Sequence, residues 1–138
     1  MWLTPICPHP RGLAEIRCRE CGPTSSRVYL LSDSWTDTER LRHHPATEKI
    51  SGQLYAAVSS IAANVGEGYS RSSGRDRSRI FEYALSSARE SMTWYQSAEP
   101  VLGAELVCAR LDTLEEIRRL LLAIIPRERS RLIRPTKR

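Results

Sequence analysis

The sequence predicts an all-α protein, an antiparallel up-down-up-down four-helix bundle. Three observations support this prediction: three long segments repeat apolar residues at helical spacing, short turns with glycine or proline separate them, and no segment shows strand-like alternation. Short connections favour antiparallel neighbours, and a shorter helix from the N-terminal part would complete the bundle. With 138 residues, 41% hydrophobic and 27% charged, the chain is long enough for one domain with its own core.

The N-terminal part is expected to be an irregular leader over residues 1–23. Prolines at positions 5, 8 and 10 break any early helix, and Gly22-Pro23 interrupts the chain again after a short helix-compatible run. Residues 24–34 form the first predicted helix. Residues 35–45 are expected to be a polar connection, from which Trp35 and Leu41 reach the core.

The three stronger helices follow from residue 47 onward. Thr47 is the expected N-cap of the first of them, which carries an apolar stripe and weakens at Gly66 and Gly68. The next is expected over residues 75–98 and the last over residues 104–125, with Pro126 as its end. The predicted bundle therefore covers residues 24–126, and residues 127–138 form a tail.

The chain has a net charge of +5, and its basic residues are concentrated in two places, the C-terminal tail and residues 71–79. Residues 126–138 hold six basic residues and one acid, an excess equal to the net charge of the whole chain. Because arginines near phosphates add a salt-sensitive attraction, such clusters suit a polyanion; a solvated tail that aids solubility is the alternative. The candidate nucleic-acid-binding residues are Arg71, Arg75, Arg77, Arg79, Arg127, Arg129, Arg131 and Arg134.

Two segments resemble a known family. Residues 60–71 read SIAANVGEGYSR, which is similar to the signature of the four-helix-bundle proteins encoded in intervening sequences of bacterial large-subunit rRNA genes. Residues 81–91 resemble the family's next helix, and residues 28–32, with Trp35 where the family usually has Phe, resemble the end of its first helix. The similarity covers roughly residues 25–125.

The resemblance implies a homo-oligomeric ring, typically a pentamer, of bundle protomers. A related branch, the accessory variability determinant of diversity-generating retroelements, implies a basic surface that binds nucleic acid and a reverse transcriptase. The family's first helix is usually continuous, whereas Gly22-Pro23 interrupts it in this chain.

Asn64, Glu67 and Gly68 are the distinctive residues of the signature. Asn64 and Glu67 share one helix face, and Glu67 lies four residues before Arg71, a spacing that favours an ion pair. Gly68 permits close contact or a left-handed helix end. We interpret the three as a structural clamp rather than a catalytic site, because one carboxylate without a second acid, histidine or metal ligand is poor catalytic equipment.

The leader contains Cys7, His9, Cys18 and Cys21, which could hold zinc. The Cys7-x-His9 spacing is too tight for common ligand pairs and no second CxxC exists, so no metal or other cofactor is predicted. No apolar run is long enough to span a membrane and no secretory signal is recognisable, so a cytoplasmic protein is expected.

Three hypotheses follow from the sequence. The first is a non-enzymatic oligomer whose basic surface binds RNA or DNA. The second is an adaptor for another protein without a nucleic-acid role, and the third is an enzyme or zinc protein that depends on the cysteine-containing leader.

Overall fold

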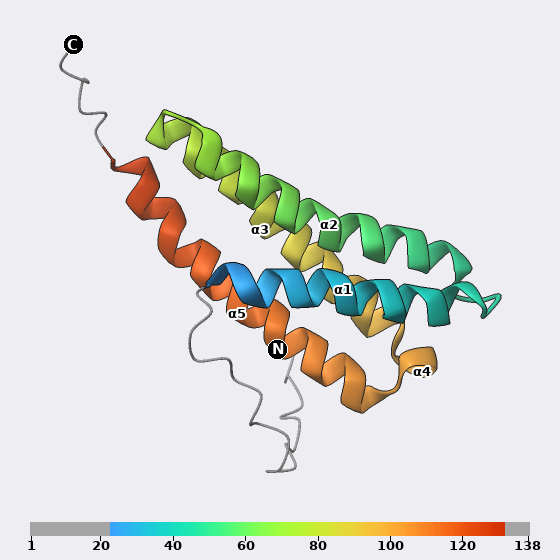
Figure 1. Ribbon diagram of the computed structural model, residues 1–138. Helices are drawn as coiled ribbons and strands as arrows, with labels where there is room; N and C mark the ends of the chain where they lie inside the picture. Colours follow the sequence, from blue (N-terminus) through green and yellow to red (C-terminus); the bar gives the residue numbers. More distant parts are fainter. Residues whose placement is uncertain (1–22, 132–138) are drawn as a thin grey trace.

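The structure, a computed structural model, describes residues 23–131 and the side chains from Leu30 onward. The described chain contains five helices and no strand, which confirms the all-α class (Figure 1). The helices are α1 (Pro23–Arg42), α2 (Glu48–Ser70), α3 (Gly74–Ser97), α4 (Glu99–Leu102) and α5 (Ala104–Arg129).

The four long helices pack in the order of the sequence. Helix α1 packs mainly against α2, α2 lies along α3, and α3 lies along α5. At 1.5 Å per residue, the 20 residues of α1 span about 30 Å and the 26 residues of α5 about 39 Å. Because α1 is the shortest of the four, it leaves one end of the α2–α3–α5 assembly uncovered (Figure 1).

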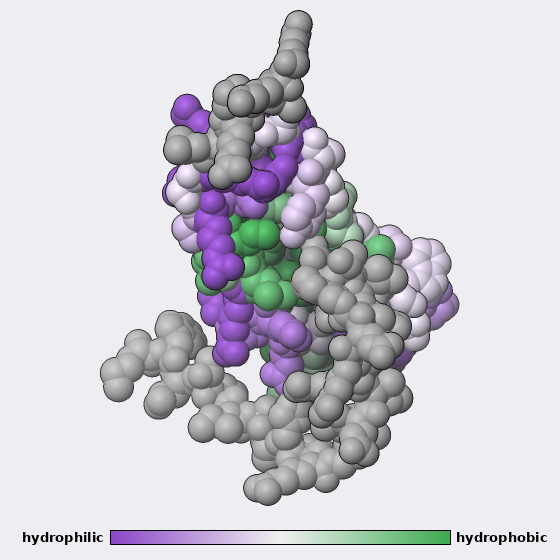
Figure 2. All heavy atoms as spheres, turned by 60° about the vertical axis from the view of Figure 1, so that its left-hand side comes forward, coloured by the Kyte–Doolittle hydropathy of each residue, from purple (hydrophilic) through white to green (hydrophobic). Residues whose placement is uncertain are grey.

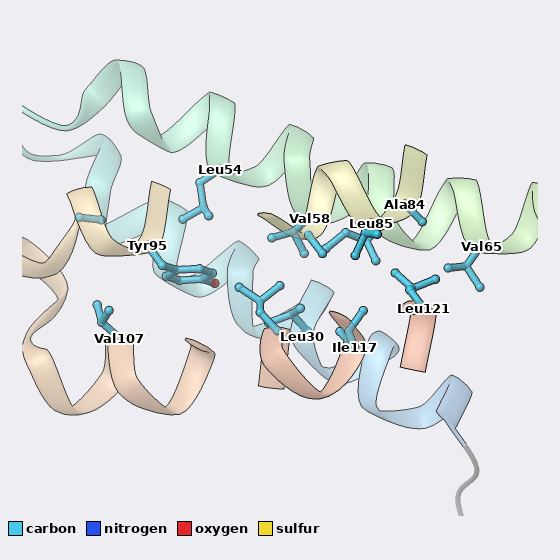
Figure 3. Packing of buried hydrophobic residues seen from close by; sticks show 14 of the residues in the cluster. Leu30, Leu54, Val58, Val65, Ala84, Leu85, Tyr95, Val107, Ile117 and Leu121 are labelled. Atoms are coloured by element: carbon cyan, nitrogen blue, oxygen red, sulfur yellow. The ribbon is translucent and has the colours of Figure 1, made fainter. Parts of the chain in front are cut away.

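The core consists mainly of aliphatic side chains from all four long helices. In Figure 3 the ring of Tyr95 lies between Leu54 and Val107, whereas Val65 and Leu121 lie toward the other end of the cluster. Tyr95 is 0% exposed and Phe81 1% exposed, so these two rings are the largest fully buried side chains described. Burial of such side chains contributes about 1.5–3 kcal/mol each, before the entropic cost of ordering the chain.

The polar connection predicted over residues 35–45 is wrong, because α1 continues to Arg42. Polar side chains occupy buried positions of this helix and hide its helical pattern: Ser34, Asp37 and Thr38 are 0%, 1% and 5% exposed. The Ser34 hydroxyl donates to the Leu31 carbonyl at 2.8 Å, and the Thr38 hydroxyl donates to the Trp35 carbonyl at 2.9 Å.

The two side chains expected to reach the core from this segment differ in their burial. Leu41 is fully buried, as predicted, but Trp35 is 53% exposed and meets Tyr55 edge-on, with ring centroids 5.4 Å apart. Thr47 precedes α2 but does not cap it through its side chain. Its hydroxyl instead donates to the Leu41 carbonyl at 2.8 Å, which ties the start of α2 back to the end of α1.

Two further boundaries differ from the predicted ones. The turn before α5 contains the one-turn helix α4, with Pro100 in its first turn and Gly103 at φ 90°, a backbone conformation that favours glycine, at its end. Pro126 does not end α5, which continues to Arg129. Pro126 and Leu122, whose carbonyl loses its helical donor, are both exposed, so water can satisfy that carbonyl.

The predictions for the N-terminal leader and for residues 132–138 concern parts of the chain outside the described residues. Within residues 23–131, no helix combines the length and the apolar character that a membrane crossing requires.

Candidate nucleic-acid interface

The two basic segments of the sequence meet at one end of the bundle. A Cβ atom added to Gly74, at the start of α3, would lie 2.3 Å from the Glu128 carbonyl oxygen and 3.0 Å from that of Arg131. The start of α3 therefore touches the end of α5, and only a residue without a side chain fits at this contact. We call this region the arginine-rich end; its described arginines are Arg71, Arg75, Arg77, Arg79, Arg127, Arg129 and Arg131.

Arg77 is part of the internal structure of this end. Its Nη1 lies 3.0 Å from Glu128 Oε2, and its Nη2 donates to the Arg71 carbonyl at 2.8 Å. The side chains of Arg77 and Glu128 are only 17% and 13% exposed, and Arg77 Nε is buried without an acceptor among the described residues. Arg77 thus connects α3, the α2–α3 turn and α5, and its charge is already paired.

Four other arginines of this end also have a carboxylate partner. Arg71 pairs with Glu67, whose hydrogen bond and charge raise the pKa of Arg71. Arg79 lies 3.7 Å from Asp76, and Arg131 lies 3.5 Å from Glu128. Arg129 pairs with Glu82.

Two arginines of this end have no such partner. Within residues 30–131, neither Arg75 nor Arg127 lies within 4.0 Å of a carboxylate oxygen, and both are exposed. Arg134, the remaining candidate, lies outside the described residues.

The Asn64–Glu67–Gly68 motif occupies the last turns of α2 beside this end. Glu67 holds Arg71, and Gly68 is buried under Phe81: a Cβ at residue 68 would lie 2.5 Å from Phe81 Cε1. Asn64 is half-buried. Gly68 therefore serves close helix packing, since α2 continues beyond it to Ser70.

An apolar groove opens next to the arginine-rich end, where α1 does not cover the bundle. Its volume is about 200 Å³. Figure 2, turned toward this side, shows an apolar area flanked by hydrophilic residues. Residues of α2, α3 and α5 line the groove: Val65, Tyr69, Phe81, Ile117, Leu120, Leu121, Ala123, Ile124 and Arg127.

A buried polar cluster, not foreseen from the sequence, joins α1 to α3 and α5. Asp37 Oδ2 accepts hydrogen bonds from the Tyr95 hydroxyl at 2.9 Å and from Arg110 Nε at 2.8 Å. Arg110 Nη1 also donates to Asp33 Oδ2 at 2.7 Å. The four-residue spacing of Asp33 and Asp37 was the available signal, because it places both carboxylates on one helix face.

This cluster has the character of a structural brace. Burial and the neighbouring Asp37 charge raise the pKa of Tyr95, which therefore stays neutral and donates. Burial opposes the charge of Arg110, but the bonds and charges of Asp37 and Asp33 outweigh it and raise the pKa of Arg110. Each charged group of the cluster already faces a partner among the described residues, so the cluster joins the three helices.

No group of three or more metal-ligating side chains occurs between residues 30 and 131. The cysteines and histidine proposed as zinc ligands, Cys7, His9, Cys18 and Cys21, lie outside the described residues.

Comparison with known proteins places the fold and the motif in one family. The model of the 23S rRNA-intervening sequence proteins matches residues 25–123, most of the chain. The chain belongs to this family. The family match confirms the resemblance that residues 60–71 carry. No curated protein matches the chain.

A solved structure has the same fold as this 23S rRNA-intervening sequence protein. It is a crystal structure of a protein of unknown function from the S23 ribosomal protein family of Bacteroides thetaiotaomicron, with a TM-score of 0.69 and 21% identity. The similarity covers 74% of this chain and 96% of that chain. The family match includes the Asn64–Gly68 motif and Arg110 but ends before Arg127, Arg129 and Arg131. The α5 half of the arginine-rich end thus lies beyond the matched residues.

Proposed function

We propose that this protein binds nucleic acid through the arginine-rich end, as a non-enzymatic oligomer of helical-bundle protomers. The observation that carries the proposal is the convergence of two basic segments, about fifty residues apart in sequence, at one end of the fold. A cluster that the tertiary structure assembles is a stronger sign of a binding surface than a basic tail alone.

The charge balance of this end supports a polyanionic ligand. Seven described arginines face four acids: Glu67, Asp76, Glu82 and Glu128. Arg75 and Arg127 are exposed and have no carboxylate partner within residues 30–131, so a phosphate can reach them without breaking an ion pair in this part of the chain.

The exposed ion pairs do not prevent binding. Arg79 and its partner Asp76 are 60% and 53% exposed, and such surface pairs contribute about 0–1 kcal/mol. A phosphate, which offers several strong acceptor oxygens, can therefore replace the carboxylate at little cost. Arg77 is excluded from the proposed surface, because its pair with Glu128 is largely buried.

The test is binding to labelled structured RNA and to duplex DNA over a salt series. The family name refers to 23S rRNA, which makes structured RNA the first probe. Each phosphate contact adds about 0.7–0.9 to the slope of log K against log salt, so Arg75→Glu should reduce the slope by about 1 and weaken binding.

A matched pair of variants separates this surface from net charge. Arg79 and Arg42 each pair with an acid three residues away and are 60% and 59% exposed, but Arg42 lies at the end of α1, away from the arginine-rich end. Arg79→Glu is expected to weaken binding and Arg42→Glu to leave it nearly unchanged. Equal effects of the two, or no salt-sensitive binding at all, would contradict the proposal.

Self-association is part of the proposal and has its own support. Large apolar side chains are exposed on three helices: Trp35 on α1 is 53% exposed, Tyr83 on α3 52% and Leu122 on α5 42%. Exposed apolar surface favours contacts between protomers. Light scattering should give a multiple of 15.7 kDa, five-fold for the ring that the resemblance suggests. A mass of one chain at micromolar concentration would contradict this part.

One observation favours a protein partner as the alternative. Trp35, which is 53% exposed, and the half-buried Tyr55 form an aromatic pair across α1 and α2, and aromatic residues are enriched at protein interfaces. An adaptor, including one for a reverse transcriptase, predicts that Trp35→Ser weakens partner binding and that neither RNA nor DNA binds in a salt-dependent way.

A further inference from the structure

The apolar groove beside the arginine-rich end contains an aromatic ring that is both fixed and accessible. Tyr69 lies in the last turn of α2 and meets Phe81 edge-on, with ring centroids 5.2 Å apart and the planes at 67°. Phe81 is 1% exposed and belongs to the buried core, whereas Tyr69 is 53% exposed. Tyr69 therefore presents ring surface to the groove without a large loss of side-chain freedom on binding.

The rest of the groove is apolar except at one position. Leu120, Leu121 and Ile124 of α5 face Tyr69 across it, and Arg127 lines it one turn further along α5. Arg127 has no carboxylate within 4.0 Å in the described chain. The groove thus combines a flat apolar surface with one available positive charge.

The arrangement fits a flat, apolar-faced group that is joined to an anion. Arg71 follows Tyr69 by two residues and Arg75 by six, so further positive charge lies close to Tyr69 along the chain. In a nucleic acid, each base is joined through its sugar to a phosphate only a few bonds away. Duplex bases are paired and stacked, so they reach a protein ring only after leaving the helix, at a cost of a few kcal/mol.

We propose that the groove holds an unpaired nucleobase stacked on Tyr69, while the adjoining phosphates meet Arg71, Arg75 and Arg127. This inference rests on the proposed function and specifies it: the ligand is a single-stranded segment or a loop rather than a continuous duplex. Recognition by stacking tolerates different bases, because every base has a π-face.

The test uses a short single-stranded RNA that contains the fluorescent base 2-aminopurine, and the same RNA in a duplex. Stacking contributes about 1–3 kcal/mol per base, so Tyr69→Ala should weaken single-strand binding about 5- to 150-fold. The 2-aminopurine fluorescence should fall on binding to the wild-type protein and not to this variant. Duplex binding should be weaker in the wild type and little changed in the variant.

Three further variants sharpen the test. Tyr69→Phe retains the ring and should bind single strands like the wild type. Tyr83→Ala removes a tyrosine that is 52% exposed on α3 but does not line the groove; whatever it does to contacts between protomers, it should leave the fluorescence change on binding intact. Ala123→Phe fills the groove without changing charge or Tyr69, and it should also abolish the fluorescence change. Thermal unfolding checks that each variant remains folded.

The failures of the two proposals are distinguishable. If Arg75→Glu weakens RNA binding but Tyr69→Ala and Ala123→Phe do not, the base site is wrong and the nucleic-acid interface stands. If no RNA or DNA binds, both are wrong. If Tyr69→Ala changes the molecular mass of the assembly instead of its RNA affinity, a second copy of the chain covers the groove and the base site is overturned.

Discussion

The hydroxyl of Tyr95 on α3 donates a 2.9 Å hydrogen bond to the carboxylate of Asp37 on α1, and both side chains are buried, 0% and 1% exposed. Fifty-eight positions separate the two residues in sequence. A buried carboxylate is costly unless it is paired and hydrogen-bonded, and Arg110 of α5 completes the arrangement from a third helix. One buried charge therefore fixes how α1, the shortest long helix, is placed against the rest of the bundle.

Removal of the positive member of this cluster should be severely destabilising. Arg110→Met leaves Asp37 buried with only the Tyr95 hydroxyl, and an uncompensated buried charge costs about 3–5 kcal/mol. Denaturant unfolding measures the loss. Arg119→Met on the same helix, where the side chain is 76% exposed, should change stability by less than about 1 kcal/mol.

A double variant distinguishes lost charge pairing from lost packing. Asp37→Asn combined with Arg110→Met removes both charges and keeps an acceptor for Tyr95, so it should recover a large part of the stability lost in Arg110→Met. If the double variant is as unstable as the sum of the two single variants, the cluster does not act as one unit.

The protein should lose stability at alkaline pH through Tyr95. Burial raises the pKa of this phenol above its ordinary value near 10, so the folded chain keeps the proton that the unfolded chain releases. The contribution is complete below about pH 10 and falls as pH rises further, by up to about 1.4 kcal/mol per pH unit. Unfolding midpoints at about pH 9 and pH 11 measure this loss.

Tyr95→Phe provides the control for the alkaline effect. Phenylalanine has no proton to lose, so the variant is less stable near neutral pH, by about 1–3 kcal/mol, but should decline less steeply above pH 10. Equal slopes for the wild type and Tyr95→Phe would show that another group causes the alkaline loss.

The sequence revealed the fold where the periodicity was apolar. Helices α2, α3 and α5 carry stripes such as Leu54–Val58–Ile61–Val65, and these residues are buried in the structure. The predicted first helix ends too early, at residue 34, because buried Asp37 and Thr38 beyond it are polar and indicate a solvent-exposed connection. Hydrogen bonds to carbonyls and to Arg110 satisfy them, and those partners are not visible in local sequence.

The candidate site could be predicted only in part for a similar reason. Charge counting identified the basic segments but not their convergence, which depends on how the start of α3 meets the end of α5. It also could not show that Arg77 is largely buried in a pair with Glu128. Arg75, two positions earlier, is exposed and has no carboxylate partner in the part of the chain that the structure describes. The groove could not be predicted either, because it depends on α1 being shorter than α2, α3 and α5 and leaving one end of them uncovered.

Gly68→Ala should destabilise the bundle, whereas Gly66→Ala should not. A Cβ at residue 68 would lie 2.5 Å from the ring of Phe81, which is 1% exposed, while a Cβ at residue 66 meets nothing within 4 Å. Both lie in α2, so alanine gains about 0.5–1 kcal/mol of helix propensity at either. Overpacking at residue 68 costs about 1–3 kcal/mol and exceeds that gain. Thermal unfolding of the two variants in parallel measures the difference, and equal stability would contradict the packing role of Gly68.

Gly74→Ala should open the arginine-rich end. A Cβ there would lie 2.3 Å from the Glu128 carbonyl oxygen, and because the obstacle is backbone, either α3 or the last turn of α5 must move. That movement would lengthen the 3.0 Å pair of Arg77 and Glu128 and separate Arg127 and Arg129 from the arginines of the α2–α3 turn. We therefore expect weaker RNA binding together with faster amide hydrogen exchange confined to residues 124–131. Gly52→Ala, where a Cβ meets nothing within 4 Å, is the control in α2. Because Gly74→Ala changes no charge, reduced RNA binding would show that the arginines must be held together. Unchanged binding with faster exchange would show that each half of the end binds independently.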